Sequence, residues 1–231
     1  MSPKDRLIIA LDVPTLDHAE KTVREIGQAG HFYKIGYQLF PIGGYDLARS
    51  LSAKGKKVFL DVKMFDIGAT VERGVQSLVP IGADILTVHT DEDTIKGAVA
   101  GRGDDQRLKI FAVTVLTSWD HRAIQKHGLP HSVMDLVLFR AEMALDAGAD
   151  GVIASAQEAS AIKKQFGDAL KIVTPGIRPA GSGADDQKRV VTPTDAINSG
   201  ADALVVGRPI VKASDPKAAA KRILEEITAT N

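Results

Sequence analysis

Short apolar runs rich in valine, isoleucine and leucine recur along the chain, and longer stretches with helical spacing of apolar residues separate them. The eight runs, which we predict to be strands, are Leu7–Val13, Phe32–Gly36, Lys57–Lys63, Ile85–His89, Ile110–Leu116, Gly151–Ser155, Lys171–Pro175 and Ala203–Gly207. Their near-continuous apolar character is typical of parallel strands buried on both faces, and the spacers suit right-handed helical crossovers. The predicted helices include Leu16–Ala29, Gly43–Ala53, Val71–Ile81, Met134–Ala147, Ser160–Phe166 and Pro216–Ile227.

A short repeat supports this alternation. Gly82-Ala83-Asp84, Gly148-Ala149-Asp150 and Gly200-Ala201-Asp202 each stand between a helical pattern and the next apolar run, where a glycine ends the helix and a strand begins. Eight units in 231 residues correspond to about 29 residues each, near the roughly 30 of one strand–helix–strand step. We therefore predict the α/β class and a closed (β/α)8 TIM barrel, as a single domain over residues 1–231. A doubly wound sheet fits less well, because no run departs from the pattern as an edge strand and no glycine-rich dinucleotide fingerprint follows the first run.

Composition excludes several classes of function. Lys+Arg and Asp+Glu each number 29, so the formal net charge is zero and no chain-wide field attracts nucleic acid or anionic lipid. The chain has no cysteine, which excludes disulfide scaffolds, thiolate metal sites and a cysteine nucleophile. No apolar stretch approaches the ~18 residues needed to span a bilayer, and the start lacks an apolar signal core. We expect a cytoplasmic protein that has neither nucleic acid nor membrane as a partner.

Charged residues gather at the carboxyl ends of the first three predicted strands, where barrel enzymes carry their chemistry. The first run ends near Asp12, the second carries Lys34, and the third ends in Asp61 and Lys63, with Asp66 just beyond. Alternation of side chains along a strand places Asp61 and Lys63 on the same, inward side. Neighbouring opposite charges favour each other's ionised forms, so we predict an alternating Lys–Asp–Lys–Asp cluster at the barrel mouth. A structural ion-pair network that only caps the barrel is the alternative interpretation.

The last two predicted strands indicate a phosphate site. Pro175-Gly176-Ile177-Arg178 follows the seventh run, and Gly207-Arg208 follows the eighth. Glycine N–H groups and two guanidinium donors at these adjacent strand ends are typical of phosphate binding in barrels. The small, polar segment between them predicts a closing lid over about residues 178–192. Glycines at helix starts that serve packing alone are the alternative.

A metal centre is disfavoured by the same charge pattern. Asp12, Asp61, Asp66 and His89 could surround Mg²⁺, but the interleaved lysines compete for those carboxylates. We therefore predict no metal and no other cofactor. His89, which stands at the end of the fourth run, is left without a role.

The segment Asp61-Val62-Lys63-Met64-Phe65-Asp66-Ile67 resembles the D-x-K-x-x-D-I signature of the orotidine 5′-monophosphate decarboxylase family. The resemblance extends along the whole chain in order. Its other parts are Leu11-Asp12, Tyr33-Lys34-Ile35-Gly36, Leu116-Thr117-Ser118, Pro175-Gly176-Ile177-Arg178 and Gly207-Arg208-Pro209-Ile210. The chain departs from the family pattern at Gly68-Ala69, where many members have Pro-Asn, and at His89-Thr90-Asp91-Glu92, where a small glycine-containing turn is commoner.

The resemblance implies a role for each matching residue. Asp12 and Lys34 would hold the ribose hydroxyls, Asp61 would lie against the substrate carboxylate, and Lys63 would deliver a proton to the carbon left behind. Two further groups are implied. Residues contributed across a dimer interface to the neighbouring subunit's site would be Asp66, Ile67 and Thr70. Residues around the pyrimidine and the phosphate would be Thr117, Ser118, Pro175, Arg178, Gln187, Gly207 and Arg208.

The implied activity is cofactor-independent decarboxylation of orotidine 5′-monophosphate to uridine 5′-monophosphate and CO₂, the last step of de novo pyrimidine nucleotide biosynthesis, by a homodimer with shared active sites. Two alternatives stay open. A Mg²⁺-dependent sugar-phosphate decarboxylase or aldolase of the same barrel group resembles the signature but has a carboxylate at the place of Lys34. The other alternative is a nucleotide-binding barrel without catalysis. Replacement of Lys63 by alanine discriminates the two, because a binding protein would keep its function whereas an enzyme would lose turnover and retain some ligand affinity.

Overall fold

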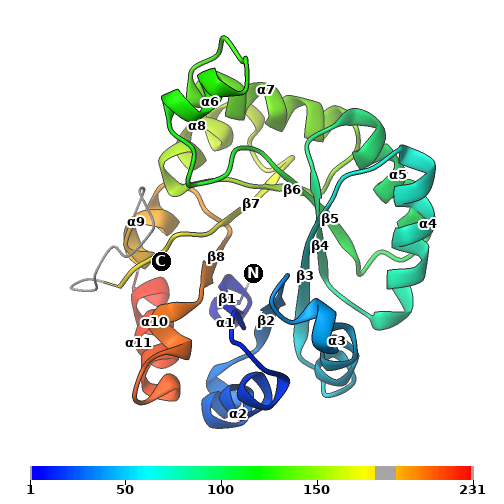
Figure 1. Cartoon of the computed structure of the whole chain (residues 1–231). Coiled ribbons are helices and arrows are strands. Elements are labelled where there is room, and N and C mark those ends of the chain that lie inside the picture. Colours follow the sequence, from blue (N-terminus) through cyan, green and yellow to red (C-terminus); the bar gives the residue numbers. More distant parts are fainter. Residues whose placement is uncertain (1, 180–190, 230–231) are drawn as a thin grey trace.

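The computed structural model describes residues 2–179 and 191–229, and it forms a closed barrel of eight parallel strands in chain order (Figure 1). The predicted (β/α)8 barrel is therefore confirmed. The strands are β1 Leu7–Ala10, β2 Phe32–Ile35, β3 Lys57–Met64, β4 Ile85–His89, β5 Lys109–Val113, β6 Gly151–Ile153, β7 Lys171–Thr174 and β8 Ala203–Val206. Most are shorter at their carboxyl ends than predicted, because the last apolar residues of several runs lie in the loops that leave the barrel.

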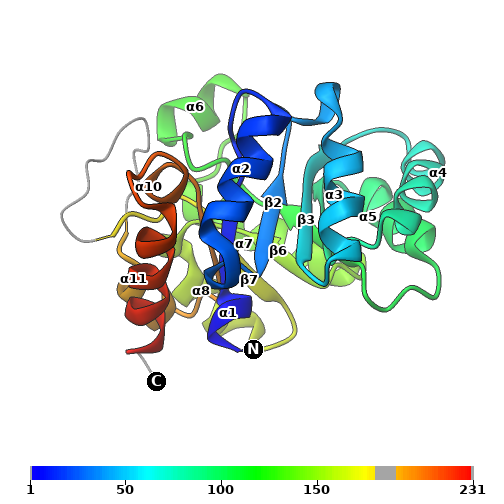
Figure 2. The same cartoon turned by 90° about the horizontal axis from the view of Figure 1, so that it is seen from below.

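Helices surround the barrel, and most of the longer ones begin at a side-chain cap (Figure 2). They are α1 Pro3–Arg6, α2 Leu16–Ile26, α3 Gly44–Ala53, α4 Gly68–Leu78, α5 Glu92–Arg102, α6 His121–Lys126, α7 Val133–Asp146, α8 Ala156–Phe166, α9 Pro193–Asn198, α10 Arg208–Val211 and α11 Pro216–Thr228. Single 3₁₀ turns are η1 Gly27–Ala29, η2 Phe40–Ile42 and η3 Val79–Ile81. The capping residues are Thr15, Asp91, Asp120, Ser132, Ser155, Thr192 and Asp215, each accepting a backbone N–H of the first turn. Within the described residues no helix has the length and apolar character to cross a membrane.

Helix α5 was not among the helices predicted from the sequence, and its packing explains why. The helix is rich in small residues and lacks a strong apolar stripe, because it lies against α4 through glycines. A Cβ at Gly97 would lie 2.3 Å from the carbonyl oxygen of Gly68, and one at Gly101 would lie 2.4 Å from that of Glu72. Close backbone approach replaces the large apolar side chains on which helical periodicity depends.

The core has two layers. An inner cluster fills the barrel and includes Phe32, Phe59 and Phe111, whereas a larger outer cluster packs the strands against the helices. Alternate strand residues serve the two layers: Ile8 belongs to the inner cluster and Ile9 to the outer one. Both faces of the strands are thereby buried, which is the reason for the near-continuous apolar runs in the sequence.

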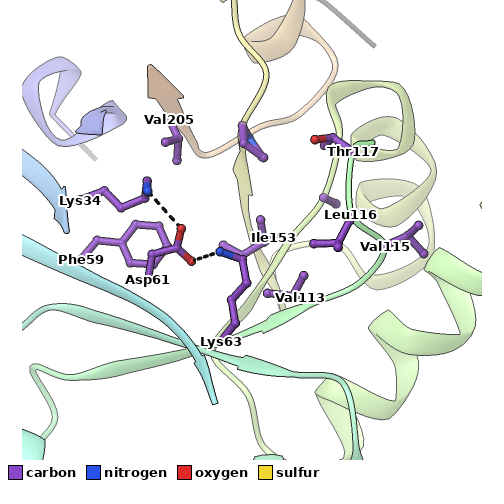
Figure 3. Close-up of a pocket in the computed structure, with 12 residues that line it drawn as sticks. Lys34, Phe59, Asp61, Lys63, Val113, Val115, Leu116, Thr117, Ile153 and Val205 are labelled. Atoms are coloured by element: carbon purple, nitrogen blue, oxygen red, sulfur yellow. Dashed lines mark hydrogen bonds and ion pairs between the residues drawn. The ribbon is translucent and has the colours of Figure 1, made fainter. Parts of the chain in front are cut away.

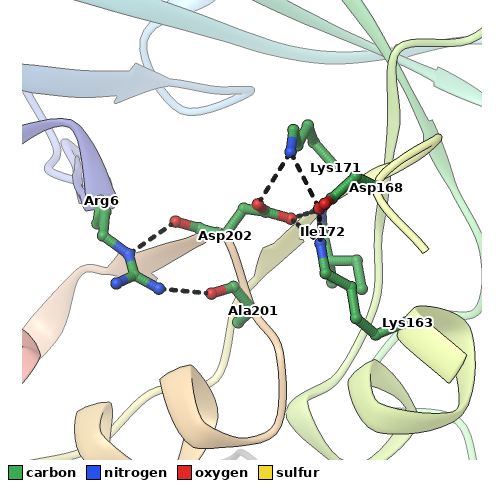
Figure 4. Close-up of polar contacts among 7 residues, drawn as sticks. All are labelled: Arg6, Lys163, Asp168, Lys171, Ile172, Ala201 and Asp202. Carbon is green, nitrogen blue, oxygen red and sulfur yellow. Dashed lines mark hydrogen bonds and ion pairs between the residues drawn. The ribbon is translucent and has the colours of Figure 1, made fainter. Parts of the chain in front are cut away.

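The repeated Gly-Ala-Asp triplets stabilise the amino-terminal end of the barrel. The carboxylates of Asp84, Asp150 and Asp202 accept backbone N–H groups of the preceding strand at 2.8, 2.9 and 2.9 Å. Basic side chains pair with these carboxylates, as Lys163 and Lys171 do with Asp202 (Figure 4). These charges are satisfied structural pairs, so the chemistry-bearing charges are those at the opposite end.

Candidate active site

A chain of four alternating charges lies at the carboxyl end of the barrel. The Lys34 ammonium lies 3.1 Å from a carboxylate oxygen of Asp12 and 3.1 Å from Oδ2 of Asp61. The Lys63 ammonium lies 2.7 Å from the other oxygen of Asp61 (Figure 3). Within one chain the order is therefore Asp12–Lys34–Asp61–Lys63, with Asp61 bound on both oxygens by lysines.

Three neighbouring strands bring these residues together. Lys34 near the end of β2 is in register with Ala10 of β1 and Phe59 of β3. Asp12 follows β1, and Asp61 lies two residues beyond Phe59. Gly36 leaves room for the ammonium, since a Cβ there would lie 3.3 Å from Lys34 Nζ. Glycine at this position lets the Lys34 side chain reach between the two carboxylates.

Strand β3 reaches Lys63 through an irregular backbone. Leu60 pairs with Leu86 of β4, but the next pair is Met64 with Val88, so β3 uses four residues where β4 uses two. Lys63 has φ of 51°, the one positive value for a non-glycine residue in the part of the chain that the structure describes. Asp61 and Lys63 line the same cavity as expected, although a bulge rather than regular alternation places Lys63 there.

Burial and pairing act in opposite directions on the protonation of the network. Burial alone would raise the pKa of Asp61, but Lys34 and Lys63 outweigh it and hold that pKa below its ordinary value. Burial would lower the pKa of Lys34, and Asp61 and Asp12 outweigh it and raise that pKa. Both groups stay ionised at neutral pH, which fixes a charged pair in a site where Lys34 is only 7% exposed.

A cavity of about 180 Å³ lies beside the Lys63 ammonium, and away from the charged residues its wall is mostly apolar. Sequence reasoning missed most of this wall, whose residues come from β3, β5, β6 and β8 and from the loops after β5 and β6. They are Phe59, Val113, Val115, Leu116, Ile153, Ala154 and Val205, beside Thr117 and Pro175. Inward-facing apolar residues at strand ends are the signal that could have identified them.

A second cavity of about 570 Å³ adjoins the first, and the two share Lys34, Asp61, Pro175 and Val205. Its far end carries the residues predicted to bind phosphate: Gly176, Arg178, Gly207 and Arg208. Gln38 and the exposed Lys212, which the sequence analysis did not single out, also line it. Arg178 is 6% exposed and donates to the carbonyl oxygen of Ile177 at 2.9 Å. The two joined cavities thus have a basic, glycine-containing end near Arg208 and an end near Lys63 that combines charged and apolar residues.

Several predicted site residues lie apart from these two cavities. Asp66, Ile67 and Thr70 are exposed beyond β3 and line neither cavity. The Asp66 carboxylate accepts the N–H of Ile67, and the Thr70 N–H bonds the Ile67 carbonyl at the start of α4. Ser118 is exposed next to Thr117 and does not line the cavities either. Gln187 and residues 180–190 of the predicted lid lie outside the described residues.

His89 stands at the end of β4, edge-on to Phe65 with ring centroids 5.7 Å apart. Burial, Lys63 and Arg140 together hold its pKa below the ordinary value, so the imidazole is neutral at neutral pH.

Among the described residues no group of three or more acidic or histidine side chains is arranged to hold a metal ion. Both carboxylate oxygens of Asp61 contact lysine ammonium groups, which compete with a cation for them.

Comparison with known proteins connects this geometry to one family. The profile of the family described as "Orotidine 5'-phosphate decarboxylase / HUMPS family" matches residues 5–223. The orotidine 5′-phosphate decarboxylase of Rhodopseudomonas palustris strain BisA53 is 53% identical over 224 residues, which cover 97% of this chain and 95% of that protein. That of Methylobacterium sp. strain 4-46 is 52% identical over 229 residues, covering 98% and 97%.

A solved structure agrees over the same extent. The crystal structure of orotidine 5′-phosphate decarboxylase from Lactobacillus acidophilus superposes with a TM-score of 0.84 at 37% identity, covering 96% of this chain and 98% of that one. Sequence and fold match together over nearly the whole chain. The chain belongs to the orotidine 5′-phosphate decarboxylase / HUMPS family.

Proposed function

We propose that this chain decarboxylates orotidine 5′-monophosphate to uridine 5′-monophosphate and CO₂ without a cofactor, as the last step of de novo pyrimidine nucleotide biosynthesis. The observation that carries the proposal is the placement of the Lys63 ammonium. It is held at 2.7 Å by Asp61 and borders a largely apolar cavity, which adjoins a second cavity with a basic far end. Family membership and relatives with this name support the same activity.

The two cavities suit the two ends of such a nucleotide. The phosphate would lie at Gly207, Arg208 and Arg178, where backbone N–H groups and guanidinium groups meet. Asp12 and Lys34 would hold the ribose hydroxyls at the junction of the cavities. The pyrimidine would then enter the smaller cavity, with Thr117 toward its polar edge and Pro175 beside it, while Ser118 follows Thr117 outside the cavity.

The chemical step needs one proton and no external electron acceptor. The bond between the ring carbon and the carboxylate breaks, CO₂ leaves, and the electron pair remains on the ring carbon. The Lys63 ammonium stabilises this developing negative charge and then donates its proton to the carbon, forming the C–H bond of the product. The resulting neutral amine regains a proton from solvent, which completes the cycle.

Asp61 has two roles in this scheme. It holds the Lys63 ammonium in place before the substrate binds, which removes an orientation requirement from the transition state. Its ionised carboxylate would also face the substrate carboxylate, and that repulsion is relieved as CO₂ departs. Because Lys34 and Lys63 keep the pKa of Asp61 low, the carboxylate stays ionised in the working pH range.

Decarboxylation is measured by the loss of substrate absorbance in the ultraviolet, with EDTA present. We expect full turnover in EDTA, whereas turnover that requires added Mg²⁺ would favour the metal-dependent sugar-phosphate alternative. Lys63→Ala should lower kcat by about 10³-fold or more, because it removes both charge stabilisation and the general acid. Lys96→Ala, at an exposed lysine on α5, is the matched control and should leave kcat unchanged. If the unaltered chain binds the nucleotide but does not turn it over, and Lys63→Ala leaves that binding unchanged, the protein would be a non-catalytic nucleotide-binding barrel.

We further propose a homodimer whose subunits share their active sites. The support is the position of Asp66 on the exposed loop after β3, between Phe65 and Ile67, which are 68% and 77% exposed. An acidic residue flanked by exposed apolar side chains suits an interface more than a solvated surface. Asp66, Ile67 and Thr70 would complete the neighbouring subunit's site, where Asp66 would add a carboxylate to those of Asp12 and Asp61.

Complementation tests the shared site. Co-expressed Lys63→Ala and Asp66→Ala chains should regain about a quarter of normal activity, since half of randomly paired dimers contain one intact site of two. Each variant alone should stay inactive. An active monomer in light scattering at assay concentration, or no recovery in the mixed dimers, would refute sharing. The cytoplasmic location expected from the sequence stays a prediction, as does closure of a lid over the phosphate end.

A further inference from the structure

The backbone at Lys63 adopts a conformation that a lysine disfavours. Its φ of 51° lies in the left-handed region, which an L-residue with a Cβ enters only when its surroundings hold it there. This is also where β3 slips by two residues against β4, between the pairs Leu60–Leu86 and Met64–Val88. The bulge aims the Lys63 side chain at the cavity, so whatever holds the bulge also holds the ammonium.

Thr87 of β4 holds the bulge from inside the barrel. The Lys63 N–H donates to the Thr87 hydroxyl oxygen at 3.0 Å, and the Thr87 hydroxyl donates to Asp61 Oδ1 at 3.0 Å. The same Asp61 oxygen accepts the Lys63 ammonium at 2.7 Å. Thr87 therefore joins the backbone and the side chain of Lys63 through one carboxylate oxygen, in a closed ring of hydrogen bonds.

Burial makes the Thr87 hydroxyl difficult to replace. Thr87 is fully buried, whereas its neighbours Leu86 and Val88 belong to the outer core, so Thr87 faces the barrel interior. A single hydroxyl serves as acceptor and donor at once. Its loss at this fully buried position would leave the Lys63 N–H without its acceptor and deprive the Asp61 oxygen of one of its donors.

Tyr37 holds the other side of the same peptide. Its hydroxyl donates to the Val62 carbonyl oxygen at 2.7 Å, and the Lys63 ammonium lies 5.7 Å from the centre of its ring. The Val62–Lys63 peptide is thus bonded at its C=O by Tyr37 and at its N–H by Thr87. Tyr37 is 63% exposed, so water can take the place of its hydroxyl more easily than it can at Thr87.

We propose that Thr87 is a positioning residue for decarboxylation, which fixes the left-handed bulge at Lys63 and orients Asp61 toward the ammonium, and that Tyr37 is a weaker second hold on the same peptide. The inference rests on the proposed function, in which Lys63 acts on the substrate. Thr87 itself need not touch the substrate. It acts through the position of the Lys63 ammonium.

Thr87→Val is the decisive variant, because valine has nearly the shape of threonine without the hydroxyl. We expect kcat to fall by about 10- to 100-fold with KM changed by less than about threefold, since misplacement of a reacting group lowers the rate more than ground-state binding. Thr87→Ser keeps the hydroxyl and should restore kcat to within about threefold of the unaltered chain. Tyr37→Phe should have a smaller effect than Thr87→Val.

Three kinetic outcomes would overturn the inference. They are a kcat of Thr87→Val within about threefold of the unaltered chain, failure of Thr87→Ser to restore kcat, or a fall in kcat that only accompanies loss of uridine 5′-monophosphate binding. A crystal structure of Thr87→Val gives a readout that does not depend on turnover. The Lys63 ammonium should leave Asp61 Oδ1, and an unchanged bulge with that contact intact would also refute the inference. If the unaltered chain shows no decarboxylation, the proposed function fails. The crystal structure of Thr87→Val would still decide whether Thr87 positions Lys63.

Discussion

Replacement of Lys34 by methionine removes the central cation of the charge network with little change in packed volume. The two side chains are similar in length, and methionine adapts readily to an apolar site. In the variant, Asp61 keeps the Lys63 ammonium at 2.7 Å but loses the 3.1 Å contact on its other oxygen. Asp12 loses its 3.1 Å contact as well.

The two lost contacts differ in energy because they differ in exposure. The Asp12 side chain is 53% exposed, so solvent screens its pair with Lys34 and the contribution is below about 1 kcal/mol. The side chains of Lys34 and Asp61 are only 9% and 13% exposed, and breaking such a buried pair from one side costs about 3–5 kcal/mol. Lys63 remains as a partner, so we expect the lower end, about 3 kcal/mol of unfolding free energy.

The loss should depend on pH in a definite direction. Because the lysines hold the folded-state pKa of Asp61 below its ordinary value, the ionised carboxylate contributes stability above the unfolded pKa of about 3.9, and this is lost as the pH falls through the lower folded pKa. Without Lys34 the folded pKa rises. The difference between variant and unaltered chain should therefore be largest at neutral pH and shrink only as the pH falls below about 4, toward the folded-state pKa of Asp61.

Urea unfolding, followed by circular dichroism and by the fluorescence of the single tryptophan, measures this difference at about pH 7.5 and about pH 3. Lys96→Met is the control, since solvent screens that exposed pair and its loss should leave the free energy of unfolding unchanged within experimental error. A loss below about 1 kcal/mol for Lys34→Met, or an equal loss at both pH values, would refute the reasoning.

Three other predictions follow from single contacts. Asp150→Ala leaves a β5 backbone N–H without its acceptor and should lower the free energy of unfolding by about 2–3 kcal/mol with kcat unchanged; a similar fall in kcat would contradict a purely structural role. Gly30→Ala should destabilise by about 1–3 kcal/mol, because the new Cβ would lie 2.0 Å from the Tyr33 hydroxyl oxygen, and Tyr33→Phe should recover part of that loss in a double-mutant cycle. In an NMR titration His89 should show a pKa below 6.5, which rises in Lys63→Ala as the neighbouring positive charge is removed; an unchanged midpoint would contradict that coupling.

Sequence alone predicted the architecture and placed all four members of the charge network at the barrel mouth. Strands buried on both faces produce continuous apolar runs, and a charged residue at the end of such a run has few places to lie except the barrel mouth. Lys34 and Asp61 were predicted on this basis, and the structure places them 3.1 Å apart. These inferences succeed because they depend on short-range alternation and on the fixed direction of parallel strands.

Tertiary structure decided how the site is assembled. Thr87 bonds Lys63 across 24 positions in the sequence, and the bulge it holds depends on how β3 registers against β4. No local pattern encodes that register. Within one chain Asp12 rather than Asp66 completes the network, because Lys34 of β2 lies against the end of β1. Which side chains meet across strands depends on stagger and closure of the whole barrel, and these are properties of the packed fold.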